Sequence, residues 1–171
     1  MKKISAILIL PVLAVAAAGC GSSSSSSSTP AATSTTSAKK PAKAAATKLT
    51  ISAATVPGLG VILVNAKGRT LYTFAPDKKS KVTCTSSCAS VWPPVTLSAG
   101  EAPAAAKQIK ASLLSSDANP SGGKVVTYAG WPLYTYVTDS APGTAAGQAL
   151  NLNGGLWYVI TPAGKVITKK P

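Results

Sequence analysis

Gly68-Arg-Thr-Leu-Tyr-Thr-Phe-Ala-Pro-Asp77 and Gly130-Trp-Pro-Leu-Tyr-Thr-Tyr-Val-Thr-Asp139 are two segments of this chain that lie 62 residues apart and resemble each other. Their glycine, leucine, tyrosine, threonine and aspartate are identical, and an aromatic residue stands two positions after the tyrosine in both. A short hairpin cannot bury its apolar face alone, whereas two copies can cover each other. The repetition therefore predicts a domain of two pseudosymmetric, hairpin-containing units.

Flanking residues extend the repetition in both directions. With the same offset, Leu63-Val64 aligns with Val125-Val126. A tryptophan follows each segment: Trp92 comes 20 residues after the first tyrosine, and Trp157 comes 23 residues after the second. We expect both tryptophans to belong to the shared apolar seam between the two units.

Short apolar runs bounded by turn residues predict that the domain is mainly β. The runs are Leu49–Ser52, Val61–Val64, Thr70–Phe74, Val91–Leu97, Lys124–Tyr128, Leu133–Val137, Leu156–Ile160 and Lys165–Thr168. Three connections, Asn65–Gly68, Ala129-Gly130 and Thr161–Gly164, have the composition of hairpin turns. The Ala-rich stretch Glu101–Leu114 is a weak candidate for a short helix, in which Pro103 fits only a starting position.

The amino terminus has the parts of an export signal, namely two lysines, 15 uncharged residues from Ile4 to Ala18, and small residues before Cys20. A membrane-spanning helix needs about 20 apolar residues, so this shorter run favours an export signal over a membrane span. The sequence Ala17-Ala18-Gly19-Cys20 resembles the lipobox of lipoprotein signal peptidase, although leucine is usual where Ala17 stands. We expect cleavage before Cys20 and a thioether between the Cys20 sulfur and diacylglycerol with palmitate-type chains. This lipid would anchor the protein at the outer face of the cell membrane. An ordinary secretory signal is the alternative.

The composition divides the chain into three parts. We expect a signal peptide at 1–19 and a lipidated cysteine with a disordered Ser/Thr/Ala/Lys tether at 20–47, because such a tether has little apolar surface to bury. One β-domain should follow at 48–171, with repeats around 56–97 and 120–164.

The duplicated motif resembles a known family. Tyr72-Thr-Phe-Ala-Pro-Asp77 and Tyr134-Thr-Tyr-Val-Thr-Asp139 both fit the pattern Tyr-x-(Phe/Trp/Tyr)-x-x-Asp. The chain is similar in this to the predicted bacterial lipoproteins that carry this motif, also described as a secreted repeat of unknown function. The resemblance covers about Val56 to Gly164 and implies an extracytoplasmic lipoprotein without implying an activity.

Two interpretations of the motif stay open. On a strand, Tyr72 and Phe74 share one face, while Leu71 and Thr73 share the other. In the structural interpretation the aromatic residues fill the interface between repeats and the aspartates cap turns. In the ligand-binding interpretation they line a groove for a sugar ring or a peptide. The residues concerned are Tyr72, Phe74, Asp77, Trp92, Tyr134, Tyr136, Asp139 and Trp157.

Cys84 and Cys88 remain as a pair once Cys20 takes lipid, and outside the cytoplasm such a pair forms a disulfide. A redox role of this Cys-x-x-x-Cys pair is the sharper alternative. The chain contains no histidine, which excludes Ser-His-Asp and Cys-His nucleophilic sites and His-based zinc catalysis. We therefore expect no metal and no cofactor.

The formal net charge of +13 falls to +11 once Lys2 and Lys3 leave with the signal. An exported protein rarely meets nucleic acid, so anionic lipid headgroups or anionic cell-wall polymers are the partners that this charge favours. The alternative is that the lysines only maintain solubility.

These features predict an envelope-anchored lipoprotein whose β-domain is a binding or structural module and not an enzyme. Two enzymatic alternatives stay open. One is a hydrolase that uses Asp77 and Asp139 as acid and base. The other is a redox accessory that uses Cys84 and Cys88. The sequence predicts neither the ligand nor the oligomeric state.

Overall fold

The computed structural model of the protein describes residues 48–77 and 81–171. The expected signal peptide at 1–19, the expected lipidation site Cys20 and the expected tether at 20–47 lie outside these residues. Among the described residues, no helix has the length and apolar character that a membrane crossing requires.

The described part of the chain is mainly β, as the sequence predicts. Its elements are β1 (Lys48–Val56), β2 (Gly60–Asn65), β3 (Tyr72–Phe74), the 3₁₀ turn η1 (Ala75–Asp77), α1 (Ser87–Val91), β4 (Thr96–Leu97), β5 (Ala102–Ala105), the 3₁₀ turn η2 (Ala111–Leu113), β6 (Leu114–Ala118), β7 (Lys124–Tyr128), β8 (Trp131–Pro132), β9 (Asn151–Leu152), β10 (Gly155–Ile160) and β11 (Val166–Ile167).

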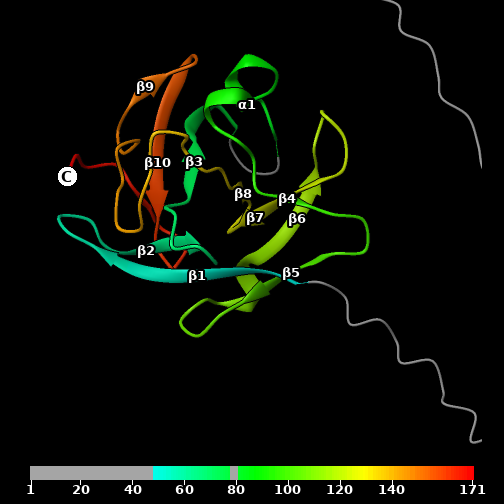
Figure 1. The fold of residues 1–171 in the computed structure, drawn as a ribbon, viewed down its shortest axis with the longest axis horizontal. Helices are drawn as coiled ribbons and strands as arrows, with labels where there is room; N and C mark the ends of the chain where they lie inside the picture. The colour runs from blue at the N-terminus through cyan, green and yellow to red at the C-terminus, as the bar shows by residue number, and fades with distance from the viewer. Residues whose placement is uncertain (1–47, 78–80) are drawn as a thin grey trace, which may run out of the picture. The chain divides into compact units, whose positions relative to one another are not determined.

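These strands form three small sheets. The first has the order β2-β1-β5, the second β11-β10-β3 with β9 paired to β10, and the third β4-β7-β6 with β8 paired to β7. Figure 1 shows the long β1 crossing below β10 and β3, which run side by side, with β6 and β7 on the other side of the domain. The second and third sheets each combine strands from both halves of the domain, so the halves interlock.

The three predicted hairpin turns are confirmed. Ala129 and Gly130 both have positive φ, 50° and 80°, as a two-residue hairpin loop between β7 and β8 requires. In the first turn, the side-chain oxygen Oδ1 of Asn65 accepts hydrogen bonds from the backbone N–H groups of Lys67 and Arg69. The Thr161–Gly164 turn joins β10 to β11.

The alignment of the strands before the motif was wrong by one residue. Leu71 N–H donates to Leu63 O at 3.0 Å, and Leu133 N–H donates to Val126 O at 3.0 Å. Leu63 therefore corresponds to Val126 and not to Val125, because the first hairpin turn is one residue longer than the second. A slip of one residue exchanges the two faces of a strand, so only this register puts both residues in the same core.

Two of the expected strands are mostly irregular. Within Leu133–Val137, pairing is limited to isolated bridges from Tyr134 to Tyr72 and to Pro94. Within Val91–Leu97, only β4 is a regular strand, and Val91 ends helix α1. Prolines in this segment have no N–H to donate, which limits regular pairing.

The Ala-rich stretch Glu101–Leu114 does not form the short α-helix that its composition allowed. Its first part is β5, which pairs in parallel with β1, and η2 and β6 follow. Pro103 is tolerated because β5 is an edge strand. Pairing with β1 here overrides the helix preference of alanine.

The motif segments separate two hydrophobic cores. The aromatic core comprises Val56, Leu59, Ile62, Tyr72, Phe74, Cys84, Cys88, Trp92, Tyr134, Trp157 and Val159. The aliphatic core comprises Ile51, Leu63, Leu71, Val95, Ile109, Val126, Tyr128, Leu133 and Ile160. Leu71 faces the aliphatic core while Tyr72 and Phe74 face the aromatic core, which is the alternation that a strand predicts.

Candidate functional site

The two motif segments meet at the centre of the domain. Tyr72 N–H donates to Tyr134 O at 2.9 Å, and Tyr134 N–H donates to Tyr72 O at 3.0 Å. This reciprocal pair is the arrangement of two residues related by a local two-fold axis. The two equivalent tyrosines therefore lie side by side.

Each repeat exchanges its tryptophan segment with the other. Trp157 in β10 pairs with Phe74 in β3. On the other side, the segment after Trp92 pairs with the second motif, where Pro94 bridges Tyr134 and Pro93 O accepts from Thr135 N–H at 2.9 Å. Neither repeat alone contains the strand partner of its own motif.

The tyrosine hydroxyls follow the same exchange. Tyr72 OH donates to Asp139 Oδ2 at 2.6 Å, and Tyr134 OH donates to Asp77 Oδ2 at 2.5 Å. The tyrosine of each motif thus binds the aspartate of the other motif. Both aspartates are buried, with exposures of 0% and 1%.

The second oxygen of each carboxylate holds the segment that follows. Asp77 Oδ1 accepts from Thr83 N–H at 2.7 Å and from Thr83 Oγ1 at 2.6 Å. Asp139 Oδ1 accepts from Ala146 N–H at 2.9 Å, and the next amide, Gly147 N–H, donates to the Tyr72 hydroxyl at 3.2 Å. Each aspartate therefore links the loop that follows it to the tyrosine of the other motif.

The hydrogen bonds to these carboxylates come from uncharged groups. Among the described residues, the donors to Asp77 and Asp139 are hydroxyls and backbone amides. A buried charge is costly unless hydrogen bonds or an opposite charge compensate it. Because both oxygens of each carboxylate accept from such donors, the hydrogen bonds provide this compensation.

Burial raises the pKa of Tyr72 and Tyr134 far above the ordinary value of 10.0. The hydrogen bond to Asp139 and the charge of that carboxylate raise the pKa of Tyr72 further, and Asp77 acts in the same way on Tyr134. Both hydroxyls therefore keep their protons while the protein is folded.

Four aromatic side chains form a continuous stack, and Tyr72 and Tyr134 contact its two inner members edge-on. Phe74 stacks on Trp157 at 4.2 Å between centroids, Trp157 on Trp92 at 3.9 Å, and Trp92 on Tyr136 at 4.1 Å. The interplanar angles are 19°, 4° and 17°. Tyr72 meets Trp92 edge-on at 5.4 Å, while its counterpart meets Trp157 edge-on at 5.2 Å. We call these six residues the aromatic column.

The column packs closely against the backbone at two glycines. A Cβ atom on Gly147 would lie 2.6 Å from the Trp92 ring, and a Cβ atom on Gly155 would lie 2.8 Å from the Phe74 ring. Only glycine fits at these positions. Both glycines fall in stretches that carry the family resemblance, but sequence reasoning did not place either of them among the site residues.

One indole breaks the symmetry of the column. Trp157 Nε1 donates to Leu152 O at 3.0 Å. Trp92 Nε1 is buried and has no hydrogen-bond partner among the described residues. The repeats are thus equivalent in ring packing and differ in indole hydrogen bonding.

The structure joins Cys84 and Cys88 by a disulfide. Both cysteines are buried in the aromatic core, with exposures of 2% and 8%, and Trp92 N–H donates to Cys88 O at 2.8 Å. The disulfide therefore constrains the turn that precedes Trp92. Its sulfur atoms are poorly accessible to a thiol that could react with them by disulfide exchange.

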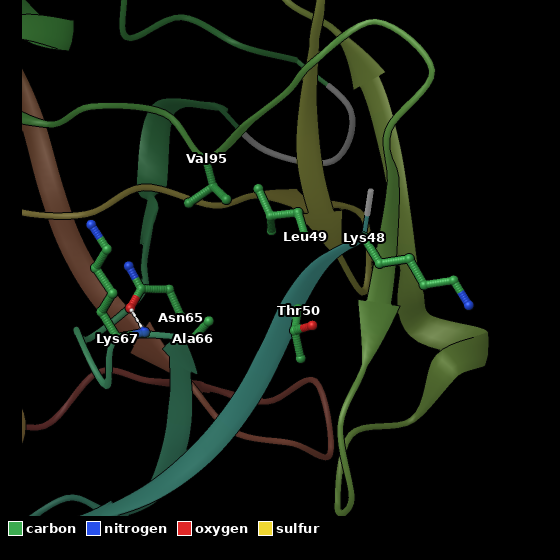
Figure 2. A pocket seen from close by; sticks show the side chains of 7 residues that line it. All are labelled: Lys48, Leu49, Thr50, Asn65, Ala66, Lys67 and Val95. Carbon is green, nitrogen blue, oxygen red and sulfur yellow. Dashed lines mark hydrogen bonds between the residues drawn. The ribbon is translucent and has the colours of Figure 1, made fainter. Parts of the chain in front are cut away.

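All eight candidate motif residues lie together, but they form packed core and not a groove. The three surface cavities that we describe lie elsewhere. One, of about 290 Å³, opens beside the start of β1, where Leu49 and Val95 provide apolar lining and the amino groups of Lys48 and Lys67 point away from each other (Figure 2). Among the described residues, no group of three or more Cys, Asp or Glu is placed to bind a metal.

The fold and this centre define a class of β domain made from two interlocked copies of one motif. The chain belongs to the family described as a secreted repeat of unknown function, whose model matches residues 54–96 and 115–161. The two matched segments each contain one tyrosine and one aspartate of the reciprocal pairs. No curated protein and no solved structure matches the chain significantly.

We predict that the tyrosine–aspartate pairs are coupled across the repeats. In a double-mutant cycle on the free energy of unfolding, Y72F with D139N should show a coupling of about 1–3 kcal/mol, because the two residues share one charged hydrogen bond. Y134F with D77N should behave alike. The matched control is Y72F with D77N, which are in the same motif and share no bond; a larger coupling there would contradict the exchanged pairing.

We predict that Tyr72 and Tyr134 do not ionise in the folded protein. Above about pH 10 the unfolded chain loses these protons and the folded protein keeps them, so the free energy of unfolding should fall as the pH rises. In an ultraviolet titration, part of the tyrosinate absorbance should appear only with unfolding, and Y72F and Y134F should each reduce that part. Complete ionisation of all tyrosines at a pH where circular dichroism still shows folded protein would refute this prediction.

Proposed function

We propose that the protein is a lipoprotein, held at the outer face of the cell membrane by lipid on Cys20, whose β domain binds anionic components of the envelope without catalysing a reaction. The absence of catalysis is proposed because the hydrogen-bonding capacity of the Asp77 and Asp139 carboxylates is already used within the protein. Both are buried, and each oxygen already accepts a hydrogen bond from the protein. A general acid or base must reach the substrate.

The lipid anchor rests on the first residues of the chain. The two lysines, the short apolar run and the small residues before Cys20 are the parts that lipoprotein export and processing require. A diacylglyceryl group carries two acyl chains, which is enough for stable anchoring. Membership of a secreted family agrees with this location.

The charge of the domain supports an anionic partner. The described residues include ten lysines and arginines and four acids, of which Asp77 and Asp139 are buried. Lys165 and Lys169 line a surface cavity of about 380 Å³ together with Thr161 and Thr168, and Lys170 follows them. Phosphate-rich lipid surfaces and anionic wall polymers have the closely spaced charges that such a surface attracts.

We predict that the mature chain begins at Cys20 and carries acyl mass on that residue. Mass spectrometry of protein extracted from membranes should find diacylglyceryl and fatty acyl groups there. C20A should be recovered without acyl mass and without membrane attachment, while the control S22A should behave as wild type. An unacylated wild-type chain would contradict the anchor and leave the binding proposal to be judged separately.

We predict salt-sensitive binding of the domain to anionic surfaces. In co-sedimentation, wild-type protein should bind vesicles of anionic phospholipid or a phosphate-containing wall polymer, and the binding should weaken as salt screens the charges. K165Q/K169Q should reduce the affinity by roughly 30-fold, since each lysine near a charged surface contributes about 1 kcal/mol.

The matched control for this experiment is K107Q/K110Q, which removes the same charge from another exposed site. Equal losses in both variants would show that only net charge matters and would contradict a site at Lys165 and Lys169. Absence of wild-type binding at low salt would contradict the anionic partner altogether.

A further inference from the structure

The aromatic column has a property that neither packing nor anionic binding uses, which is continuous contact between oxidisable rings. From Tyr136 through Trp92 to Trp157, successive centroids are separated by 4.1 and 3.9 Å and the planes are nearly parallel. Rings at this distance are in van der Waals contact, so their π systems overlap. An electron missing from one indole can therefore be shared with the next.

Both ends of the indole pair contact a tyrosine that already has a proton acceptor. Tyr72 lies against Trp92 and donates to Asp139 at 2.6 Å. Tyr134 lies against Trp157 and donates to Asp77 at 2.5 Å. A phenol that loses an electron becomes a strong acid, and here a carboxylate stands within hydrogen-bond distance to accept its proton.

The local electrostatics favour a positive charge in the column. The carboxylates of Asp77 and Asp139 are buried beside the rings, and the described donors to them are uncharged. In a medium of low polarity, a nearby negative charge stabilises a cation strongly. Asp139 and Asp77 are bound to the tyrosines that contact the two indoles. An oxidised indole here is therefore stabilised relative to an indole in an apolar core without such carboxylates.

We propose that the aromatic column is a redox site that accepts one oxidising equivalent and stores it as a neutral tyrosyl radical on Tyr72 or Tyr134. A one-electron oxidant of the phenoxyl-radical or oxidised metal-complex class takes one electron and is reduced. The tyrosine O–H bond breaks, its proton passes to the hydrogen-bonded aspartate, and the products are a tyrosyl radical and a carboxylic acid. One electron from a reductant reverses the step and returns the proton.

The column has an entry point at the surface. Tyr136 is partly exposed and stacks on Trp92, whereas Trp92, Trp157, Tyr72 and Tyr134 are fully buried. A surface oxidant can therefore remove an electron at Tyr136, and the hole passes inward through the indoles. The buried disulfide of Cys84 and Cys88 plays no part in this step.

The test oxidises the full chain with photogenerated ruthenium(III) tris-bipyridine and follows the radicals by transient absorption and electron paramagnetic resonance. Wild-type protein should give a tyrosyl radical. The part of the yield that is lost in Y72F/Y134F should form more slowly in deuterated water and should not depend on buffer concentration, because the proton acceptor is internal. If that part rises in proportion to buffer base, as for tyrosines open to solvent, the proposal is overturned.

Variants that keep every ring locate the radical. Y72F and Y134F should each lower the buffer-independent tyrosyl yield by about half, and the double variant should leave the oxidising equivalent on tryptophan or Tyr136. The matched control is Y128F, since Tyr128 is also buried but donates to the carbonyl of Pro162, which cannot accept a proton. An equal loss in Y128F, or an unchanged yield in folded Y72F/Y134F, would overturn the assignment.

Discussion

The buried hydrogen bond between a tyrosine of one repeat and an aspartate of the other is the interaction on which the structure depends. A carboxylate enters an apolar core only if its oxygens are occupied, and here the second oxygen of each aspartate is filled by a loop that must then fold over the core. The two buried groups of the motif are therefore each stabilised by a distant part of the chain. The tyrosine needs the distant aspartate, and the aspartate needs the following loop.

Exchange between the repeats explains why the chain carries the motif twice. The strand that covers Phe74 comes from β10 of the second repeat, and the segment that pairs with Tyr134 follows Trp92 of the first. A single repeat would expose both an aromatic face and an unpaired strand edge, which are costly in water. The same two-fold relation stacks Trp92 on Trp157 and places against each indole a tyrosine that is hydrogen-bonded to an aspartate.

The burial of this centre favours a role within the domain, and a partner would have to contact other residues at the surface. The aspartates are closed off and the cysteines are buried, so neither faces a cleft. What remains accessible is a basic exterior with shallow hollows, such as the one beside Lys165 and Lys169. The proposed storage of an oxidising equivalent in the core and the proposed binding of anions at the surface would use separate parts of one small fold.

Local patterns in the sequence determined the mainly β class, the three hairpin turns and the eight residues of the centre, because alternation and turn chemistry act over a few residues. They could not determine that Leu63 corresponds to Val126, since one extra residue in a turn is invisible without pairing partners. They also missed β5, where pairing with β1 overrides the helix preference of alanine, and Gly147, which is required by the Trp92 ring. Only the tertiary structure decided which tyrosine binds which aspartate, because hydrogen bonds between residues about 60 positions apart depend on topology and not on spacing.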